Sequence, residues 1–564
     1  MSVQKKVINT DVLVVGGGVA GCMAAIAARD TAPVDVTILE KAALVRSGDA
    51  GAGNDHFLAH LNSGPEWDTD EAMATYYSRL SQGLAPVAVA KVLHLNRISE
   101  IIEKLESYGI PIRDRKTGEF IRTKSFGQPG PYYINFKGKH LKPALAEQVK
   151  KRNVRVVNRV NATSLLSEGK KVFGAMGFNV RSGEFYEVRS KVTILALGDA
   201  VRLWPNVSGL PFNTWMSPFN NGAGYAMAFK AGAELANMEI AAVTVVPKGF
   251  SAAGLNAFTG MGSYLLNSAG ERYMLKYHPM GEGAPRNTLA LGTYREYVEG
   301  RGPCYIDCRH LSKEALKHLT ENLLPIDKDT LVMFLNQKHL RLDRDLVEIG
   351  ISEMQMAGFT GSVSGIVIDR AGRTTVDRLY AAGACTVPSF ALSGAFATGY
   401  SVGEQAAQAC NRLTRKESGW AGQVEKEIAR VYAPCDRSDG VSYKRLEDRL
   451  RQIMFDYAGY VKNERGLKTG LEKLKDLEKR IDQIKAENFH ELMRALEFQD
   501  LLLTGKLVVT SALARKESRM GLSHLRADYP DESNAGAKDS TIIKAGRQGM
   551  EVSFRPSEQS AGRA

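Results

Sequence analysis

The stretch VINTDVLVVGGGVAGCMAAIAARD, residues 7–30, decides the fold of this chain. It begins with a short apolar strand, continues through a glycine turn into a helix rich in Ala and Met, and is followed by the strand VDVTILE. This order of elements is a βαβ unit. It predicts an α/β fold with a Rossmann-like nucleotide-binding domain.

The glycine turn carries the spacing of a dinucleotide site. Gly16, Gly18 and Gly21 fit the pattern GxGxxG: the first makes the tight turn, the second lets a pyrophosphate approach, and the third allows close helix packing. The helix N-terminus offers backbone N–H groups to the phosphates. Glu40 ends the second strand, where a carboxylate accepts hydrogen bonds from ribose hydroxyls. A turn without a ligand would leave Glu40 unexplained.

The recurring pattern of a strand followed by a glycine turn divides the chain into segments. Residues 8–236 and 348–415 have this pattern, the latter in DRLYAAGAC, and are assigned to the nucleotide-binding domain. Residues 237–347 lack the pattern and predict an inserted α+β capping domain. Residues 416–530 have apolar residues at three- and four-residue spacing and predict a helical domain. Residues 531–564 are polar and rich in Gly and Ser, which predicts a tail that is disordered or draped on the surface.

Composition and charge exclude several classes of protein. The 564 residues suffice for about two to four structural units, and the apolar and charged fractions are those of a folded, water-soluble chain. No apolar run could span a bilayer and the start lacks an apolar signal core, so a cytoplasmic location is expected. The net charge of +12 suits an anionic substrate, an acidic redox partner or nonspecific polyanion contact. No nucleic-acid-binding signature accompanies it.

The six cysteines are scattered and form no CxxC pair. An internal Fe–S cluster, another metal site or a disulfide framework is therefore not expected. Cys304 and Cys308 share one face of a predicted strand in GPCYIDC, but two ligands are too few for a metal ion. We interpret them as core thiols.

Further motifs give the chain a family resemblance. LLNSAGERYM, APRN, YIDCRHL, DRLYAAG, MRALEFQD and ARKESRMGLSHLRADYP follow one another in order. With these motifs the sequence resembles the flavoprotein subunits of the fumarate reductase and succinate dehydrogenase superfamily, from Asp11 to about Pro530. The resemblance implies that the cofactor is FAD rather than NAD. It also implies an FAD-binding domain in two parts, 8–236 and 348–415.

The same resemblance assigns the FAD contacts. A helix beginning near Ser393 and Gly394 would aim its N-terminus at the flavin and stabilise the reduced, anionic ring; a small-residue helix packed tightly on a sheet is the alternative, and both can hold. Ala384 and Ala223 replace acidic residues of the family, so the ribityl contacts must differ. The expected FAD contacts are Gly16, Gly18, Val19, Ala20, Gly21, Glu40, Lys41, Ser47, Gly48, Ala196, Gly198, Asn221, Gly383, Ala384, Ser393, Gly394 and Ala397.

The flavin is expected to be held non-covalently. Membrane-bound members of the superfamily attach it to a histidine in an RSHT-like stretch, and Gly48 stands at that position in Arg46-Ser47-Gly48. The absence of a tether fits a soluble or lower-potential enzyme.

The substrate pocket resembles the alpha subunit of adenylylsulfate reductase more than the fumarate branch. Val246-Pro247-Lys248 replaces a His-Pro-Thr stretch that binds fumarate, and PSFALSGAFATG has no counterpart of the second substrate arginine. INFKGKHLKPALAEQVKK, the flavin loop and Pro285-Arg286-Asn287 match the adenylylsulfate branch. Val246 departs from that branch too, because the branch has an arginine there. Arg286 is expected to hold an anionic substrate near flavin N5; a structural ion pair is the alternative.

Four other residues are candidates for catalysis or substrate binding. Asn54 lies near the active-site asparagine of the adenylylsulfate branch, and His56 could donate a proton or hydrogen bond near the flavin. Lys248 could replace an anion-binding arginine, and Glu353 stands where the family often has a substrate-facing polar residue. Their alternatives are an ordinary loop histidine, an exposed lysine and a strand or loop carboxylate.

These expectations combine into a working function. The chain is expected to carry out redox chemistry at flavin N5 on a small anionic substrate, with a capping domain that closes over it. A separate ferredoxin-like Fe–S subunit would exchange the electrons, because this chain has no cluster ligands. The alternatives are a dicarboxylate enzyme of the fumarate reductase, succinate dehydrogenase or L-aspartate oxidase type, and a non-catalytic flavin subunit that relays electrons.

Overall fold

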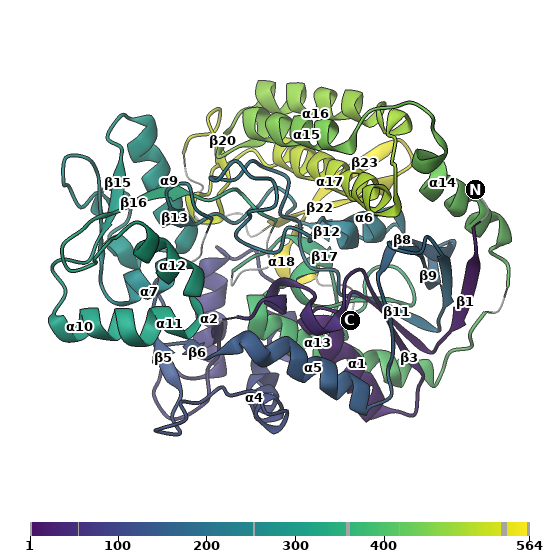
Figure 1. The fold of residues 1–564 in the computed structure, drawn as a ribbon, viewed down its shortest axis with the longest axis horizontal. Helices are drawn as coiled ribbons and strands as arrows, with labels where there is room; N and C mark the ends of the chain where they lie inside the picture. The colour runs from purple at the N-terminus through teal and green to yellow at the C-terminus, as the bar shows by residue number, and fades with distance from the viewer. Residues whose placement is uncertain are drawn as a thin grey trace.

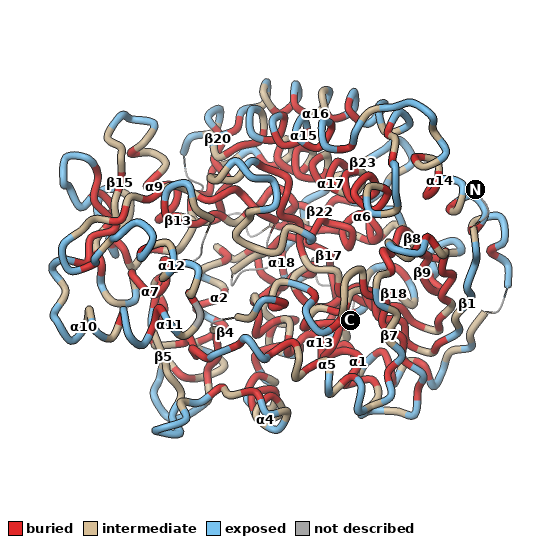
Figure 2. The backbone as a smooth tube through the Cα atoms, viewed as in Figure 1, coloured by how far each residue is buried: buried red, intermediate tan, exposed pale blue. Residues whose placement is uncertain are grey.

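The structure, a computed structural model of the chain, describes residues 3–54, 56–251, 254–356, 361–416, 418–531 and 539–560. Figure 1 shows three regions: a capping region on the left, a part built on a parallel sheet at the lower right, and a layer of helices along the top. The chain is buried most densely where these regions meet, as the red segments in Figure 2 show.

A five-stranded parallel sheet forms the centre of the nucleotide-binding region. Its order is β18-β11-β2-β3-β7, and every neighbouring pair is parallel. Its central strands are buried on both faces, which explains their continuous apolar sequence. The predicted βαβ unit and the α/β fold class are confirmed. The unit is β2 Val12–Val15, α1 Val19–Thr31 and β3 Val36–Glu40, and the other strands are β7 Arg155–Asn158, β11 Val192–Leu195 and β18 Leu379–Ala381.

Helix α13 (Ala391–Cys410) packs closely along α1. Gly399 and Gly403 make this possible, because an added Cβ at either position would clash with a backbone carbonyl of α1, that of Ala20 or Ala24. The small residues of this helix thus serve helix–helix packing. α13 begins at Ala391, slightly before the predicted start near Ser393.

Two smaller sheets flank the parallel one. β8 and β9 form an antiparallel pair in a sheet with the order β1-β10-β9-β8, whereas β7 joins β3 in the parallel sheet. The second small sheet has the order β4-β6-β5. The strands are β1 Lys5–Asn9, β8 Val160–Glu168, β9 Lys171–Asn179, β10 Phe185–Arg189, β4 His56–Leu58, β5 Ile121–Thr123 and β6 Tyr133–Asn135, and nearby helices are α2 Asp70–Leu80, α3 Val87–Leu93, α4 Ile98–Ser107, α5 Leu141–Lys151 and α6 Ala223–Lys230.

The capping region is a four-stranded antiparallel sheet, ordered β13-β16-β15-β14, with helices around it. This arrangement is the α+β type that the sequence predicts. Cys304 and Cys308 are both buried here. The strands are β13 Val245–Pro247, β14 Tyr264–Leu266, β15 Cys304–Asp307 and β16 Val347–Ile351, and the helices are α7 Leu255–Gly260, α8 Met274–Tyr277, α9 Arg286–Val298, α10 Lys313–Lys317, α11 Leu324–Asp327 and α12 Asp329–Gln337.

The helical layer is built from α14, α15, α16 and α17, with α15 and α16 along the top of Figure 1 and α14 at the right. α17 is its buried centre, and α14, α15 and α16 pack against it. α16 buries Leu467, Leu474 and Leu477 and leaves its lysines toward solvent, as its three-four spacing predicts. The helices are α14 Ala421–Asp436, α15 Tyr443–Ala458, α16 Glu464–Glu478 and α17 Phe489–Ala514.

The prediction of a disordered or surface-draped tail is wrong for residues 539–560. β22 (Asp539–Gly546) and β23 (Gly549–Pro556) form a hairpin, and β22 pairs with β12 (Leu235–Ala236) in the sheet β19-β17-β12-β22-β23. Ile542 and Ile543 are buried in it. The polar composition hid this strand because its apolar side chains are few and its partner strand lies about 300 residues earlier. The sheet also contains β17 Gly365–Val367 and β19 Thr386–Val387; α18 Ser557–Ser560 follows the hairpin, and β20 Val461–Lys462 pairs with β21 Leu525–Arg526.

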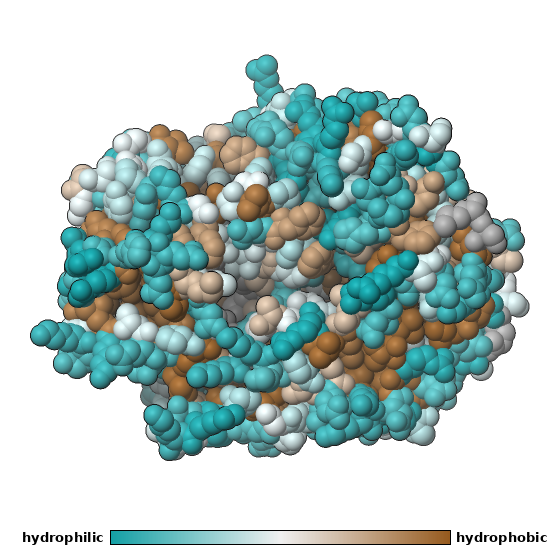
Figure 3. Space-filling view, viewed as in Figure 1, coloured by the Kyte–Doolittle hydropathy of each residue, from teal (hydrophilic) through white to brown (hydrophobic). Residues whose placement is uncertain are grey.

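The surface is predominantly hydrophilic on the side seen in Figure 3, where a recess separates the capping region from the rest of the molecule. None of the helices in the described part of the chain combines the length and apolar character needed to cross a membrane.

Candidate flavin and substrate site

A cavity of about 350 Å³ lies between the parallel sheet and the capping region. Its walls come from both, and also from the loop before α6 and the start of α13. Twelve of the expected FAD contacts line it: Gly16, Gly18, Val19, Ala20, Glu40, Lys41, Ser47, Gly48, Ala196, Gly198, Asn221 and Ala384. Gly21, Gly383, Ser393, Gly394 and Ala397 do not line it.

The glycine turn has the shape of a phosphate cradle. Gly16 has a φ of +100°, and an added Cβ would clash with the Ala196 carbonyl; at Gly21 it would clash with the Gly16 carbonyl. At Gly18 the nearest atom would be the Gly48 Cα, 4.0 Å away. Gly18 also caps α1 without a side-chain cap, and the first turn has no acidic residue. The open cradle and the helix N-terminus fit the pyrophosphate of FAD.

Glu40 holds the turn and also lines the cavity. Its Oε2 accepts a hydrogen bond from the Gly17 N–H at 2.7 Å, and its Oε1 accepts one from the Ala42 N–H at 2.6 Å. An ionised carboxylate offers about four lone-pair sites. About two therefore remain, which leaves room for the ribose contact that the sequence assigns to Glu40.

Lys41 ties the cavity to the helical layer. Its Nζ donates to the Phe219 carbonyl and to Glu497 Oε1, both at 2.7 Å. Glu497 lies buried on α17 and also accepts from Arg202 at 2.9 Å and Arg494 at 2.6 Å. Burial would raise the pKa of Glu497, but the three cations outweigh it and hold the pKa far below its usual value. Lys41 is thus part of a buried ionic network.

The loop at Ser47 and Gly48 lies directly against the glycine turn. Ser47 Oγ donates to the Gly17 carbonyl at 3.0 Å. Gly48 has a φ of +76°, and an added Cβ would approach the Gly18 Cα to 3.0 Å. Both the conformation and the close contact disfavour any side chain there. The loop can therefore cradle a flavin but cannot supply a tether at this position.

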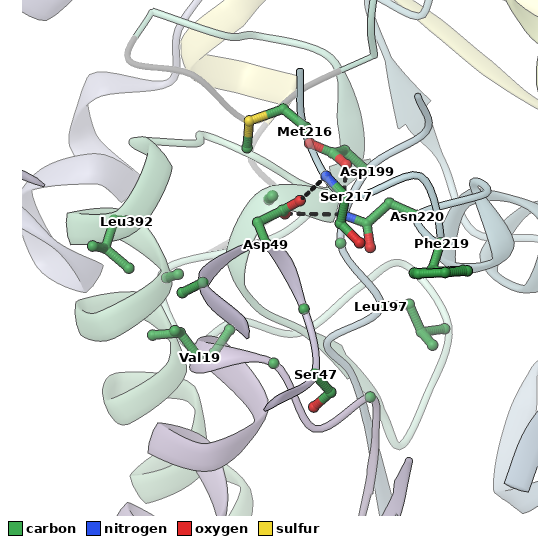
Figure 4. Close-up of a pocket in the computed structure, with 18 of the residues that line it drawn as sticks. Val19, Ser47, Asp49, Leu197, Asp199, Met216, Ser217, Phe219, Asn220 and Leu392 are labelled. Atoms are coloured by element: carbon green, nitrogen blue, oxygen red, sulfur yellow. Dashed lines mark hydrogen bonds between the residues drawn. The ribbon is translucent and has the colours of Figure 1, made fainter. Parts of the chain in front are cut away.

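A group of carboxylates in the cavity was missed by the sequence reasoning. Asp49 accepts from the Ser217 N–H and from Asn220 Nδ2, both at 2.9 Å, and the same amide donates to Asp199 at 2.8 Å (Figure 4). Burial raises the pKa of Asp49. Ala384 and Ala223 also line the cavity and bring no carboxylate there. No local spacing links Asp49 to partners about 170 residues away.

The two stretches that follow β11 and β18 support the cavity in different ways. Ala196 and Gly198 line it after β11, and Asn221 donates to Asp500 at 3.3 Å. Ala384 lines it after β18, whereas Gly383 donates its N–H to Thr398 Oγ1 at 3.0 Å inside the fold. These backbone turns shape the floor of the cavity.

The N-terminus of α13 reaches the cavity, but through neighbours of the residues that were expected to line it. Ala391, Leu392 and Ala395 line it. Ser393 Oγ instead donates to the Phe390 carbonyl at 3.1 Å. Gly394 and Ala397 are not part of the lining. The positive end of the helix dipole still lies at the cavity wall.

Three of the candidate residues for catalysis or substrate binding line the cavity together, and we call the part that they line the substrate end. Arg286 begins α9, and Asn54 and His56 line the same cavity. The His56 ring lies edge-on to Tyr133, with ring centroids 4.4 Å apart. The Arg286 guanidinium lies 4.7 Å from the centre of the Phe126 ring. Residues from the nucleotide-binding and capping regions therefore meet here.

Lys248 and Glu353 lie outside the cavity lining. Lys248 is exposed and forms an ion pair with Glu348. Glu353 is buried behind the wall, where it accepts from the Trp215 N–H at 2.7 Å and from Gln355 at 3.0 Å. Burial raises its pKa. Val246 is buried in β13.

Aromatic residues at the substrate end were also missed. Phe126, Tyr133 and Trp215 come from separate segments and line the cavity together. Phe126 has a φ of +52°, unusual for a bulky residue and typical of a functionally constrained site. The stretch SFGQPG, an aromatic residue in a Gly- and Pro-rich loop, was the available signal for it.

Comparison with known proteins identifies the class. A family described as "FAD binding domain" matches residues 11–399, so this chain is an FAD-binding flavoprotein. A second family, "Fumarate reductase flavoprotein C-term", matches residues 447–561. The chain belongs to the fumarate reductase and succinate dehydrogenase flavoprotein superfamily, which confirms the resemblance seen in the sequence.

Individual relatives match between two thirds of the chain and its full length. A fumarate reductase (CoM/CoB) subunit from Methanothermobacter marburgensis is 29% identical over 558 residues, 94% of this chain and 96% of the relative. L-aspartate oxidase of Yersinia pestis is 29% identical over 405 residues, 67% and 69% of the two chains. The structure of adenylylsulfate reductase from Archaeoglobus fulgidus matches with a TM-score of 0.89 at 24% identity, covering 100% of this chain and 98% of that one, which shows a shared fold.

The family and the geometry agree on the cofactor and on the general activity. The chain is an FAD-dependent oxidoreductase flavoprotein. FAD supplies two-electron redox chemistry at its flavin ring. The glycine turn and Glu40 fit the adenosine and pyrophosphate part, and FAD bound in this way would place its flavin toward the part of the cavity that Arg286, His56 and Asn54 line.

Proposed function

We propose that this chain is the flavin-carrying subunit of an adenylylsulfate-reductase-like oxidoreductase, and that Arg286 holds a small anionic substrate against the flavin. The placement of Arg286 at the substrate end of the FAD cavity supports this proposal. A guanidinium binds an oxyanion through two parallel hydrogen bonds, which orients the reacting group as well as retaining it. Asn54 and His56 supply further polar groups at the same end.

The distribution of positive charge favours a substrate with one anionic group at this end. Lys41, Arg46, His56 and Arg286 are the basic side chains in the described part of the lining. Lys41 is committed to Glu497, and Arg46 donates to the Lys139 carbonyl at 2.7 Å. Lys248 lies outside, paired with Glu348. A buried dicarboxylate needs two cationic partners.

A dicarboxylate enzyme is the second candidate. The names of two curated relatives, the fumarate reductase (CoM/CoB) and the L-aspartate oxidase, favour it. In that case His56, or a residue of a rearranged capping region, would have to supply the second cationic partner of the dicarboxylate. A non-catalytic flavin subunit that relays electrons is the third candidate.

The electron partner in this proposal is a ferredoxin-like Fe–S subunit. The six cysteines are dispersed, and five of them are buried as single thiols within the fold. Electrons would therefore pass between the flavin and a separate protein. A purified chain that turned over rapidly without any partner would contradict this part of the proposal.

A substrate screen tests the proposal directly. The FAD-loaded chain is mixed without oxygen with sulfite and AMP, or with succinate, and the reduced form with adenylylsulfate or with fumarate, while flavin absorbance is followed. We expect the sulfur compounds to change the flavin and Arg286→Gln to abolish the response while FAD stays bound. Lys248→Gln is the matched control and should respond as the wild type does.

Each other outcome selects a different function. A response to fumarate or succinate alone would replace the proposal with the dicarboxylate enzyme. A flavin that none of these compounds changes would favour the relay subunit. Wild-type turnover in Arg286→Gln would show that Arg286 does not hold the substrate.

A further inference from the structure

Residues 215–221 form one wall of the FAD cavity and are held by carboxylates and a lysine of other segments. At the first residue, the Trp215 N–H donates to Glu353. Further along, the Ser217 N–H donates to Asp49, and the Phe219 carbonyl accepts from Lys41. The later part of this wall therefore has its own attachments. The Trp215 backbone is attached to Glu353.

Glu353 is an unusual group to bury for stability alone. It is only 1% exposed. Its hydrogen-bond donors, among the residues that the structure describes, are the Trp215 N–H at 2.7 Å, Gln355 Nε2 at 3.0 Å and Ser251 Oγ at 3.2 Å. All three donors are neutral. Burying a carboxyl group with neutral partners is unfavourable compared with an apolar residue of the same size, so its presence points to a role in the site.

Trp215 connects this carboxyl group to the substrate end of the cavity. The Arg286 guanidinium lies 5.3 Å from the centre of the Trp215 ring and 4.7 Å from that of Phe126. Two aromatic rings thus contact one cation. Such contacts restrict the plane of a guanidinium, and that plane determines where its paired N–H groups point.

We propose that Glu353 is a positioning residue for catalysis: through the Trp215 backbone it fixes the indole ring against Arg286 and so sets the geometry of anion binding. This inference rests on the proposed role of Arg286. Glu353 lies outside the cavity lining, so it acts through Trp215 and not by contact with the substrate. The family resemblance suggested that Glu353 faces the substrate; the proposal gives it a supporting role behind the cavity wall instead.

Sulfite serves as an oxyanion probe of this geometry. The FAD-loaded protein is titrated with sulfite and the change in flavin absorbance gives a dissociation constant. We expect Glu353→Ala to weaken sulfite binding about ten- to a hundredfold with FAD content unchanged, because the half-buried Trp215 N–H loses its acceptor inside the protein. Glu353→Gln should stay within about threefold of the wild type, since its amide oxygen can accept the same hydrogen bond. Glu348→Ala, on the same strand β16 but exposed, is the matched control.

Two further readouts separate positioning from general damage. Trp215→Phe combined with Glu353→Ala should bind sulfite no more weakly than Trp215→Phe alone, because both changes act on one contact. The Trp215 emission, obtained by subtracting the spectrum of the matching Trp215→Phe protein, should shift to longer wavelength in Glu353→Ala. If Glu353→Ala fails to fold, the single variants Glu353→Gln and Trp215→Phe carry the test: Trp215→Phe should weaken sulfite binding, and a Glu353→Gln protein more than tenfold weaker would contradict the shared hydrogen bond.

The two proposals fail in different ways. Wild-type sulfite binding in Glu353→Ala, or strictly additive losses in the double variant, would overturn the positioning role and leave Arg286 untouched. Wild-type sulfite binding in Arg286→Gln would overturn the proposed function itself.

Discussion

Lys142 Nζ donates a hydrogen bond of 2.5 Å to the carbonyl oxygen of Gly17, in the middle of the phosphate-binding turn. Lys142 is fully buried on α5, and its ammonium group also lies 3.2 Å from Cys22 Sγ. A helix more than 100 residues away in the sequence therefore fixes the turn from behind. The Gly17 N–H is held on the other side by Glu40.

Lys142→Met should weaken FAD binding. The substitution keeps the length of the side chain but removes the donor, so the buried Gly17 carbonyl loses its charged partner and the turn loosens. We expect the FAD dissociation constant to rise about tenfold or more. Titration of the apoprotein with FAD, followed by flavin fluorescence, measures it. Lys150→Met, an exposed position on the same helix, should bind FAD normally.

Gly48→Ala should destabilise the protein and Gly48→His should form no flavin tether. The φ of +76° and ψ of −179° at Gly48 belong to a region open almost only to glycine, at a cost of about 1–3 kcal/mol for other residues. Urea unfolding measures the loss, and acid precipitation should release all flavin from both variants. Gly422→Ala, in a helix with open space around it, is the control. Flavin that stays with precipitated Gly48→His would refute the steric argument.

Glu497→Gln should cost about 3–5 kcal/mol, because it leaves the cations of Lys41, Arg202 and Arg494 without their buried counterion. The pKa of Glu497 is lowered by folding, so its contribution is present above the pKa of the unfolded chain and is lost as the pH falls below about 4. Denaturant melts between pH 3 and pH 7 should therefore show a smaller acid dependence in the variant. Glu472→Gln, an exposed residue on α16, should melt like the wild type at each pH.

Lys462→Met should stabilise the protein at neutral pH. Among the described residues no acceptor lies within hydrogen-bond distance of its buried Nζ. Burial, with the charge of Arg526, lowers the pKa of Lys462 to about 7. Because the unfolded chain keeps this proton up to about pH 10, wild-type stability should rise with pH between about 7 and 10. Thermal melts across this range should lose that rise in Lys462→Met and keep it in Lys468→Met, an exposed control. Equal slopes in both variants would contradict the assignment.

Part of the site could be predicted because its signals are local. Gly16, Gly18 and Gly21 have one spacing that serves one turn, and Glu40 ends the adjacent strand, so the chain itself brings them together. Gly48 was likewise identified from a neighbouring motif. α13 begins at Ala391 and not near Ser393, and the cavity is lined there by Ala391, Leu392 and Ala395 in place of Ser393, Gly394 and Ala397. A helix start is set by backbone geometry that sequence patterns locate only approximately.

The hairpin at residues 539–556 shows where local reasoning failed. Its strands are polar on the exposed face, and their stability comes from pairing with β12 far along the chain. Composition alone therefore suggested a tail. Lys248 shows a different limit of local reasoning. A motif suggested it as an anion-binding residue, but it follows β13 at the surface and forms an ion pair with Glu348, outside the cavity lining.

The sequence by itself determined the fold class, because the βαβ unit and its glycine turn depend on neighbouring residues and on backbone shapes that only glycine adopts readily. It also determined the cofactor, because motifs in a fixed order along the chain carry the family resemblance that implies FAD. Only the tertiary structure decided which distant side chains share the cavity. It placed Trp215 and Phe126 against Arg286, moved Glu353 behind the wall, and joined Asp49 to Asn220. Such contacts follow from how separate segments pack, and packing is not encoded in any local spacing.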